Sequence, residues 1–411
     1  MKILIYSHFY PPETGAAAVR MKYFVKVLEN ISHNVTVINP VPNYPNGKKD
    51  KGLKRFFYKA ENVYYLPIYV PHKDSTIKRS ISYLSYFVSS FLFTFFFVKK
   101  HEIIISSSPP IFTSLGAAFL SKIKGSHFIL DIRDIWPDIG IQLGITKNPL
   151  VISILSLIEK YVTRVADSII VTAKGDKLNL VKKGIPANKI SVIYNGADTE
   201  IFNLYSQENK MYLRQKMGLP ISKKLIVYFG SLNYGMNDIV TMAESLKRLS
   251  RIKSDIHFVL IGDGVHKKYL VNEIKNYINV SQFGPLPLKE LSEIIAACDL
   301  SLIPRKKIKT DTGGNIPVKC FESWAAGLPV IISSINGSEI NEIVKKSEAG
   351  FIVPPGDPQI LAEMIANVIS RGDLQELGVK GRNFVVKNFD RKTQSENLMV
   401  IIRNTLKIKS E

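Results

Sequence analysis

The stretch TDTGGNIPVKCFESWAAGLPVI combines a Gly-Gly loop, an ammonium and a carboxylate around the start of a predicted helix. Pro317 suits the first helical position, where its missing N–H costs nothing. Ahead of it, the two glycines and Asn315 leave backbone amides exposed to an anion. Lys319 and Glu322 are three residues apart and share one helix face. We therefore expect Lys319 to neutralise a phosphate and Glu322 to accept hydrogen bonds from paired hydroxyls, as in a ribose diol.

A Lys–Glu pair on a solvent-exposed helix is the alternative for Lys319 and Glu322. Small residues follow this pair at Ala325, Ala326 and Gly327. Because small side chains allow neighbouring elements to pack closely, they disfavour a helix that lies free on the surface.

Three further loops of the second half come directly after apolar runs. YFGSLNYGMND contributes Gly230 and Asn237, and VLIGDGV contributes Gly262 and Gly264. FGPLPLKELSEII adds a proline-rich loop ahead of an amphipathic pattern. Each signal is weak by itself because glycine is common after a strand. Three in a row along one rim of a sheet indicate a ligand site.

The first loop of the chain, in YSHFYPPETGAAAV, joins a strand pattern to an Ala-rich helix that Gly15 opens. A small residue at a helix N-terminus lets a phosphate or sugar approach the free amides. The alternative is a tight strand–helix connection that needs glycine for packing. The spacing is not GxGxxG, so a dinucleotide-binding fingerprint is not met.

A cluster of four charges follows another apolar run in FILDIRDIWPDIG. Asp131, Arg133, Asp134 and Asp138 lie within eight residues there. Loops at the carboxyl ends of strands commonly carry function, and we interpret the cluster as part of a site. The alternative is an internal ion-pair cluster that pins the loop.

Apolar, β-branched runs separated by helical patterns must position these loops. The first half contains KILIY, NVTVI, EIIIS, HFILDI, SIIVT and ISVIY, and the second contains KLIVYFG, IHFVLIG, LSLIP and PVIIS. Continuous apolar runs suit strands that are buried on both faces, as in a parallel sheet. We therefore predict an α/β protein of two Rossmann-like, doubly wound domains.

The junction between the two domains is expected near VIYNGADTEIF, where Asn-Gly signals a turn. The N-terminal domain is predicted over residues 1–200. The C-terminal domain is predicted over residues 201–389 and opens with a polar, irregular stretch. An amphipathic helix at about residues 390–411 is expected to pack back onto the first domain.

Composition limits the class of protein and its surroundings. The chain has 411 residues, a net charge of +20 and only two cysteines, without metal-type spacing. We expect no disulfide framework and a reducing cytoplasm, and the start MKILIYSHF lacks the apolar core of a secretory signal. The charge fits nucleic acid, an anionic membrane or phosphate-bearing substrates. Residues 1–200 hold 26 Lys and Arg against 14 Asp and Glu, so the first half is the more basic.

The stretch ISYLSYFVSSFLFTFFFV, residues 81–98, is uncharged and bracketed by basic pairs. Its length is near the roughly 17–20 residues that a membrane span needs. A strand pattern follows at once, so we favour a domain helix whose aromatic face lies on the bilayer over a true span. GKKDKGLKRFFYK, residues 47–59, mixes six basic residues with aromatic ones and is either a solvated loop or a membrane-surface patch.

Taken together, these motifs resemble the retaining nucleotide-sugar glycosyltransferases of family 4, whose GT-B architecture sets two Rossmann-like domains across a cleft. The resemblance runs over nearly the whole chain, through PPETG, NGAD with Phe202, LIGDG, PVKCFESWAAGLPVI and EAGFIVPPGDP. DIRDIWPD and IPVKCFESWAAG are similar to the branch of amino-sugar transferases, such as L-fucosamine transferases of surface polysaccharide assembly.

By this resemblance, the second domain would hold the nucleoside diphosphate. Glu322 would take the ribose hydroxyls, and the amides around Asn315 and Ile316 would meet the sugar and diphosphate. The loops at 262–264, with Gly262 and Gly264, and at Pro285 and Leu286 would frame the base.

The first domain would then bring Gly15 toward the diphosphate and sugar, and would bind the acceptor. Acceptors in this branch are commonly polyprenyl-diphosphate sugars, which suits the aromatic, basic first half. The implied place of work is the inner face of the cell membrane, to which the protein attaches from the cytoplasm. A nucleic-acid partner is not expected.

Two departures from the family pattern concern the donor site. The family's paired glutamates lie eight positions apart, but Gly314 stands eight before Glu322. Many relatives also place Arg and Lys after the first strand of the second domain, where GSLNYGMND has neither. Lys319 or Arg305 would supply the missing positive charge.

The implied reaction breaks a sugar–diphosphate bond, and preorganised amides and cations stabilise the leaving group. In this family the acceptor is thought to attack on the leaving-group face, so no carboxylate nucleophile, metal or other cofactor is expected. Besides Lys319 and Glu322, Asp131 and Asp134 are candidates to orient the acceptor or act as a base.

Two other functions fit parts of the sequence. Nucleotide-sugar 2-epimerases share the two-domain architecture and would release no nucleotide to an acceptor. A non-catalytic module that binds membrane or nucleic acid would show binding without transfer. Such a module leaves Glu322, on its closely packed helix, without a purpose.

Overall fold

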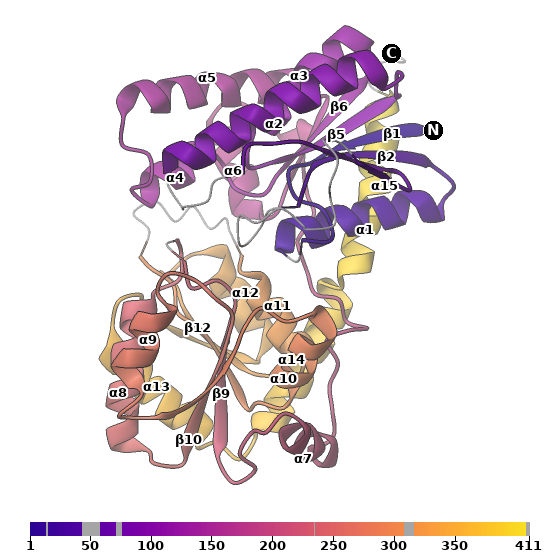
Figure 1. The fold of residues 1–411 in the computed structure, drawn as a ribbon. Helices are drawn as coiled ribbons and strands as arrows, with labels where there is room; N and C mark the ends of the chain where they lie inside the picture. Colours follow the sequence, from indigo (N-terminus) through magenta and orange to yellow (C-terminus); the bar gives the residue numbers. More distant parts are fainter. Residues whose placement is uncertain (14, 43–57, 71–75, 234, 308–315, 408–411) are drawn as a thin grey trace. The chain divides into compact units, whose positions relative to one another are not determined.

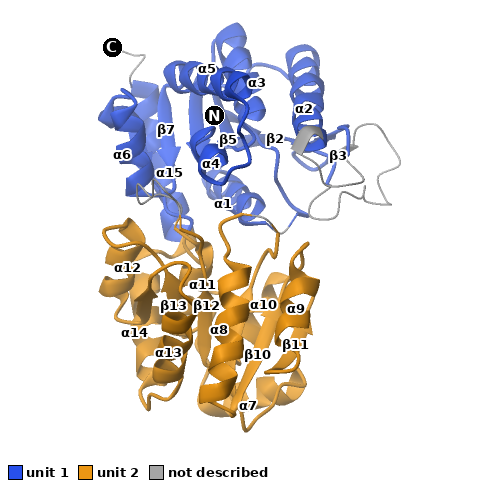
Figure 2. Ribbon diagram, turned by 90° about the vertical axis from the view of Figure 1, so that its left-hand side faces the viewer, with its two compact units in different colours: residues 1–195, 392–411 blue, residues 196–391 orange. Residues whose placement is uncertain are grey.

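The structure, a computed structural model, describes residues 1–42 except 14, 58–70, 76–307 except 234, and 316–407 (Figure 1). The chain divides into two compact units, residues 1–195 with 392–411 and residues 196–391 (Figure 2). Each unit has its own parallel sheet and its own apolar core.

The sheet of the first unit runs in the order β3-β4-β2-β1-β5-β6-β7-β8. Its strands are parallel except for β3, which pairs antiparallel with β4. The bounds are β1 (Lys2–Tyr6), β2 (Asn34–Pro40), β3 (Tyr58–Ala60), β4 (Val63–Leu66), β5 (Ile103–Ser108), β6 (His127–Ile132), β7 (Ser168–Val171) and β8 (Ile190–Val192). All six residues of β5, three isoleucines followed by three serines, are buried, as expected of a central parallel strand that is covered on both faces.

Helices cover both faces of this sheet, and α2, α3 and α5 pack side by side over one of them (Figure 1). The helices of the unit are α1 (Ala16–Asn30), α2 (Thr76–Phe97), α3 (Ile111–Lys124), α4 (Asp138–Gln142), α5 (Pro149–Val165) and α6 (Lys174–Lys182). Asn148 caps α5 by accepting from two backbone amides, and a proline follows it at the first helical position. The C-terminal helix α15 (Arg391–Lys407) joins this core through Leu398 and Ile402.

The sheet of the second unit is entirely parallel, in the order β11-β10-β9-β12-β13-β14. Its strands are β9 (Lys224–Phe229), β10 (Ile256–Ile261), β11 (Asn279–Phe283), β12 (Leu300–Ile303), β13 (Val330–Ser333) and β14 (Gly350–Val353). Its helices are α7 (Gln207–Lys216), α8 (Ile239–Ile252), α9 (Lys267–Ile274), α10 (Leu288–Ala296), α11 (Val318–Ala325), α12 (Glu339–Ser347), α13 (Pro358–Ile369) and α14 (Leu374–Asn388). The strand order reverses direction between β9 and β12, so the ligand rule for open parallel sheets points to the loops that follow them.

Two passages of the chain meet at the edge of the second unit, where the sequence leaves and re-enters the first. Ala197 N–H donates to Phe389 O at 3.0 Å, and Arg391 N–H donates to Ala197 O at 2.8 Å. Gly196, the residue before Ala197, has φ +57°, and a Cβ on it would lie 2.3 Å from Phe389 O. Only glycine fits this close approach of two backbones.

The predicted α/β class with two doubly wound parallel sheets is confirmed. The apolar runs did not reveal four short strands, β3, β4, β11 and β14, all of which lie at or next to a sheet edge. The irregular stretch expected at the start of the second domain was wrong in part, because α7 occupies residues 207–216. That helix is polar on most sides, and its buried residues are Lys210, Leu213 and Arg214, so its sequence shows only a weak apolar face.

Candidate active site

The loops after β9 and β10 pack against each other through glycine backbones. Gly230 and Gly262 have φ of +119° and +132°, and a Cβ on Gly262 would lie 2.1 Å from Gly230 O. A Cβ on Gly264, which has φ +154°, would lie 2.4 Å from the carbonyl carbon of Leu232. The structure thus brings the three predicted glycines together, and side chains there would force the loops apart.

The loop after β9 is also fixed to the residues that follow β12. Asp238 N–H donates to Pro304 O at 3.0 Å, and Lys306 N–H donates to Met236 O at 2.8 Å. Between these two hydrogen bonds, Asn237 and Arg305 form an isolated antiparallel bridge. Two predicted site residues from segments 68 positions apart are therefore neighbours, and Arg305 is buried.

Lys319, in the first turn of α11, reaches back to the end of β9. Its ammonium donates to Asn237 Oδ1 at 3.1 Å and lies 4.2 Å from the centre of the Tyr228 ring. A Cβ on Gly230 would lie 2.6 Å from Lys319 Cε, so the glycine leaves room for the lysine stem. The contact with the ring is a favourable cation–π interaction.

The charge state of Lys319 is finely balanced. Burial lowers its pKa from 10.5 to about 7, while the nearby Glu322 carboxylate opposes this shift and Arg305 adds to it. Near neutral pH the side-chain amine of Lys319 is therefore only partly protonated. A second anion close by would favour the charged form.

Glu322 lies one turn further along α11 and pairs with Arg391. Arg391 Nη2 is 3.3 Å from Glu322 Oε1, and the same nitrogen donates to Gly196 O at 2.9 Å. Burial raises the pKa of Glu322, and Arg391 and Lys319 act in the opposite direction. The carboxylate is thus oriented by a single arginine contact, and 15% of its side chain remains exposed.

The remaining donor-site predictions lie around this centre. Ile316, next to the N-cap Pro317 of α11, is buried, while Asn315 lies outside the described residues. Pro285 is exposed and Leu286 half-buried in the loop between β11 and α10. That loop is next to the one after β10, because Gly262 N–H donates to Phe283 O at 3.0 Å.

In the first unit, Asp131 is at the centre of a buried ion pair. Arg20, from α1, places Nη2 2.7 Å and Nε 3.1 Å from Asp131 Oδ1. Ser107 Oγ donates to Asp131 Oδ2 at 3.3 Å, and the carboxylate is fully buried. This is the internal ion pair that was the alternative reading of the charge cluster. A catalytic role for Asp131 stays a prediction, and its enclosure argues against proton transfer by it.

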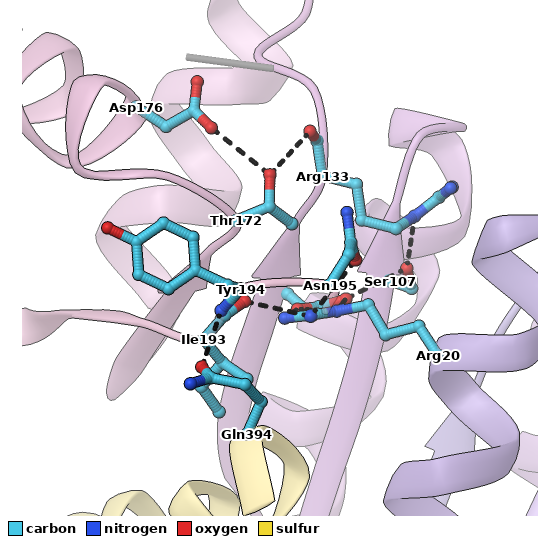
Figure 3. A network of polar contacts seen from close by, with 10 residues as sticks. Arg20, Ser107, Arg133, Thr172, Asp176, Ile193, Tyr194, Asn195 and Gln394 are labelled. Carbon is cyan, nitrogen blue, oxygen red and sulfur yellow. Dashed lines mark hydrogen bonds and ion pairs between the residues drawn. The ribbon is translucent and has the colours of Figure 1, made fainter. Parts of the chain in front are cut away.

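The contacts of Arg20 continue to the end of the unit (Figure 3). Its Nη1 donates to Ile193 O at 3.0 Å and to Asn195 Oδ1 at 3.3 Å. Arg133 is held to the same network, since its Nε donates to Ser107 Oγ at 3.0 Å. Arg20 could not be identified from the sequence, because an arginine inside an amphipathic helix usually faces solvent.

Three more residues lie at the carboxyl ends of strands in the first unit. Gly15 is the extended residue that caps α1, and Asp134 is half-buried after β6. His8, which the sequence reading missed, follows β1 and packs edge-on against Phe9 and two tyrosine rings. Its Nδ1 is buried with no hydrogen-bond partner among the described residues, and burial together with Arg133 lowers its pKa to about 3. His8 is thus a neutral imidazole at the carboxyl-end edge of the parallel sheet of the first unit.

Family models match both units. Residues 17–201 match Glycosyltransferase Family 4, and residues 223–371 match Glycosyl transferases group 1. The chain belongs to the family 4 glycosyltransferases. The resemblance read from PPETG, LIGDG and PVKCFESWAAGLPVI is confirmed by this match. In the described part of the enzyme, no three His, Cys, Asp or Glu side chains gather as metal ligands would.

Individual relatives of this glycosyltransferase are distant in sequence. WcaI of Escherichia coli (strain K12), named for colanic acid biosynthesis, is 24% identical over 404 residues, which cover 95% of this chain and 97% of WcaI. An Escherichia coli enzyme named UDP-Gal:alpha-D-GlcNAc-diphosphoundecaprenol alpha-1,3-galactosyltransferase is 26% identical over 261 residues, covering 61% of this chain and 64% of that one.

Among solved structures, HepE of Anabaena in complex with UDP and glucose aligns with a TM-score of 0.70 at 16% identity. The alignment covers 98% of this glycosyltransferase and 100% of HepE. The fold is GT-B, as the resemblance implied.

Replacement of Asp131 by Asn should destabilise the first unit. It would leave the buried Arg20 without its counter-ion, at a cost of about 3–5 kcal/mol in the free energy of unfolding. Urea denaturation measures this. Asp138→Asn is the matched control, because its pair with Lys183 at 2.9 Å is partly exposed and worth about 0–1 kcal/mol. If Asp131→Asn lowers the free energy of unfolding by less than Asp138→Asn does, a structural role for the Arg20–Asp131 pair is contradicted.

Replacement of Lys319 by Met should stabilise the second unit at neutral pH, by about 1–2 kcal/mol, because a buried ammonium is costly. The pKa of Lys319 is lower in the folded than in the unfolded chain, so the unfolded state binds more protons between about pH 7 and 10. Wild-type stability attributable to this group therefore rises with pH across that window, and the advantage of Met shrinks.

Unfolding by urea at several pH values tests this expectation. Lys216→Met, which removes a lysine that is 44% exposed, is the control and should change stability far less, because an exposed ion pair contributes little. If Lys319→Met destabilises the protein at every pH, the lysine is held for packing rather than kept ready for a ligand.

Proposed function

We propose that this glycosyltransferase moves a sugar from a nucleoside diphosphate donor, with UDP as the nucleotide, to a lipid-linked saccharide in surface polysaccharide synthesis. The names of WcaI and of the undecaprenol-linked galactosyltransferase support the process and the acceptor class. HepE, solved with UDP, supports the nucleotide. The motifs DIRDIWPD and IPVKCFESWAAG favour an N-acetylated amino or deoxyamino sugar as the group transferred.

One observation carries the proposal: Lys319 lies against Asn237 and Gly230, with Glu322 one turn beyond it on α11. An ammonium near a glycine-lined loop suits a diphosphate, because the backbone can approach the phosphate oxygens closely. A partly exposed carboxylate one turn away suits a ribose diol, whose two hydroxyls donate to it. Arg305, next to Asn237, adds a second cation in this part of the unit.

The chemistry follows from the charge that develops when the sugar–phosphate bond breaks. Negative charge grows on the leaving diphosphate, and the ammonium of Lys319 stabilises it without needing to reorganise. We propose that the acceptor hydroxyl attacks on the leaving-group side, so that configuration is retained and a phosphate oxygen takes the proton. The cations of the chain, rather than a metal, neutralise the diphosphate in this scheme.

The first unit is proposed to bind the acceptor. Gly15, Asp134 and His8 follow β1 and β6, whose carboxyl ends share one edge of the sheet. A neutral imidazole and a carboxylate suit sugar hydroxyls, which both donate and accept hydrogen bonds. Because the acceptor's lipid stays in the bilayer, the enzyme is proposed to work attached to the cytoplasmic side of the membrane.

Replacement of Glu322 by Gln should weaken UDP binding roughly tenfold, which corresponds to about 1–2 kcal/mol for a hydrogen bond to a charged group. Isothermal titration calorimetry measures the affinity. Glu363→Gln, on α13, is the matched control and should bind UDP as the wild type does. Unchanged affinity in Glu322→Gln would remove Glu322 from the nucleotide site.

A donor screen tests the activity itself. The protein is incubated with UDP- and GDP-sugars and a bacterial lipid extract, and both nucleotide release and labelled lipid are followed. UDP release that depends on the lipid, with label in the lipid fraction, is expected, and it should be lost in Lys319→Met. A changed sugar without lipid labelling would instead identify an epimerase, and no turnover with any donor would contradict the proposal.

A further inference from the structure

Helix α2 has its polarity reversed relative to a helix that covers the sheet of a water-soluble protein. Most of its large apolar side chains point outward at helical spacing, and its buried positions are mainly hydroxyl-bearing; Phe91 and Phe93 pack partly against the core. The exposed set is Ile81, Leu84, Val88, Leu92, Phe95, Phe96 and Phe97. The buried set includes Ser82, Tyr86, Ser90 and Thr94. In water, the hydrophobic effect would favour the opposite arrangement.

Hydrogen bonds fix α2 in this orientation. The Tyr86 hydroxyl lies 2.7 Å from Ser7 O and 2.9 Å from Ile38 O, and the Tyr6 hydroxyl donates to Ser90 Oγ at 2.5 Å. The helix is long and apolar enough to cross a membrane by length and composition. Its inner side, however, belongs to the core of the first unit, so α2 cannot leave the sheet to span a bilayer without breaking these contacts.

The apolar surface extends from α2 across α3 to α5. Phe119 of α3 joins the three helices, because its ring contacts Phe91 of α2 and Tyr161 of α5 at centroid distances of 6.5 and 5.4 Å. Both views of the fold show these helices as neighbours in one layer. On α5, Leu150 and Leu157 are 68% and 64% exposed, at a spacing that puts them on one side of the helix.

Charged residues around this surface are almost all basic. In α2, α3, α5 and the residues next to their ends, the basic side chains are Lys78, Arg79, Lys99, Lys100, Lys122, Lys124, Lys147, Lys160 and Arg164. Most lie at helix ends, around the apolar centre. The acidic residues in the same described segments are Glu159 and Asp167, and both are mostly buried. Glu159 pairs with Lys183 at 2.7 Å, and Asp167 accepts from Phe128 N–H at 2.8 Å.

We propose that α2, α3 and α5 together form a docking face that lies flat in the headgroup region of an anionic bilayer. The apolar centre enters the boundary of the acyl chains, and the basic rim meets lipid phosphates, as for interfacial helices of mixed character. The face deepens the membrane part of the proposed function by naming the surface and its partner. It also accounts for Phe96 and Phe97, which are 68% and 75% exposed and gain nothing from water.

A second copy of the chain fits this face less well than a lipid surface does. Self-association would bring two rims of nine basic residues together, and like charges brought together oppose binding. An anionic bilayer offers an apolar interior and a negative surface at the same time. The charge pattern therefore selects lipid over a copy of the same chain.

Vesicle binding of the full chain tests the proposal. Flotation is carried out with vesicles of phosphatidylcholine alone and of an equimolar mixture with phosphatidylglycerol. We expect tighter binding to the anionic vesicles, and a loss of about tenfold or more in the double variant Phe96→Ser/Leu157→Ser. Tyr212→Ser/Val240→Ser is the control, because it removes residues of 62% and 54% exposure from the second unit. It should bind as the wild type does.

The outcomes separate this face from its rivals and from the proposed function. Equal binding by Phe96→Ser/Leu157→Ser and wild type, with both folded by circular dichroism, would overturn the proposal. Protein that stays with the vesicles after alkaline carbonate extraction would overturn the docking-face proposal in favour of a membrane span. A dimer seen by light scattering, if the double variant abolishes it, would assign the face to self-association. Vesicle binding needs neither donor nor acceptor, so a chain that binds vesicles but transfers no sugar refutes only the proposed function.

Discussion

The predicted nucleotide site of the second unit depends on one interaction, the buried ammonium of Lys319 held against the carboxyl end of β9. Gly230 gives the lysine stem its space, Asn237 gives the ammonium an acceptor, and Tyr228 gives it a ring face. None of these partners carries a full negative charge, so the pKa of Lys319 falls to about 7 through burial. The Glu322 carboxylate nearby offsets only part of this lowering, so a further anion close to Lys319 would favour its charged form.

The family resemblance implies basic residues in the loop after β9, but GSLNYGMND has none, and the cation that lies at this loop is Lys319. Because the cation comes from α11, the loop GSLNYGMND does not need to carry a basic side chain. The loop uses its backbone to pair with Pro304 and Lys306 after β12, and its glycine to meet the loop after β10. The loop after β9 therefore contributes backbone to the predicted site, and helix α11 contributes the positive charge. The cost is a desolvated lysine, in line with the usual exchange of stability for function at binding sites.

The sequence predicted the sheets better than the charges. Long apolar runs identified the central strands because burial on both faces leaves a continuous pattern, whereas β3, β4, β11 and β14 are short edge or near-edge strands with mixed patterns. Glycines after strands correctly pointed to loops that meet. Arg20, Arg391 and His8 were missed because their partners lie far away in the chain, and only the folded chain shows which charges are neighbours. The residue roles in catalysis stay predictions.

Two carboxylates that looked alike in sequence differ in how their arginines hold them. Arg20 grips Asp131 through two nitrogens, as close as 2.7 Å, and the pair is closed to solvent. Arg391 touches Glu322 once, at 3.3 Å, and also serves Gly196 O. A bidentate buried pair is already satisfied and has little left to offer a ligand. A single long contact orients a carboxylate while leaving its other oxygen able to accept from a ligand, so Glu322 rather than Asp131 has the geometry of a binding group.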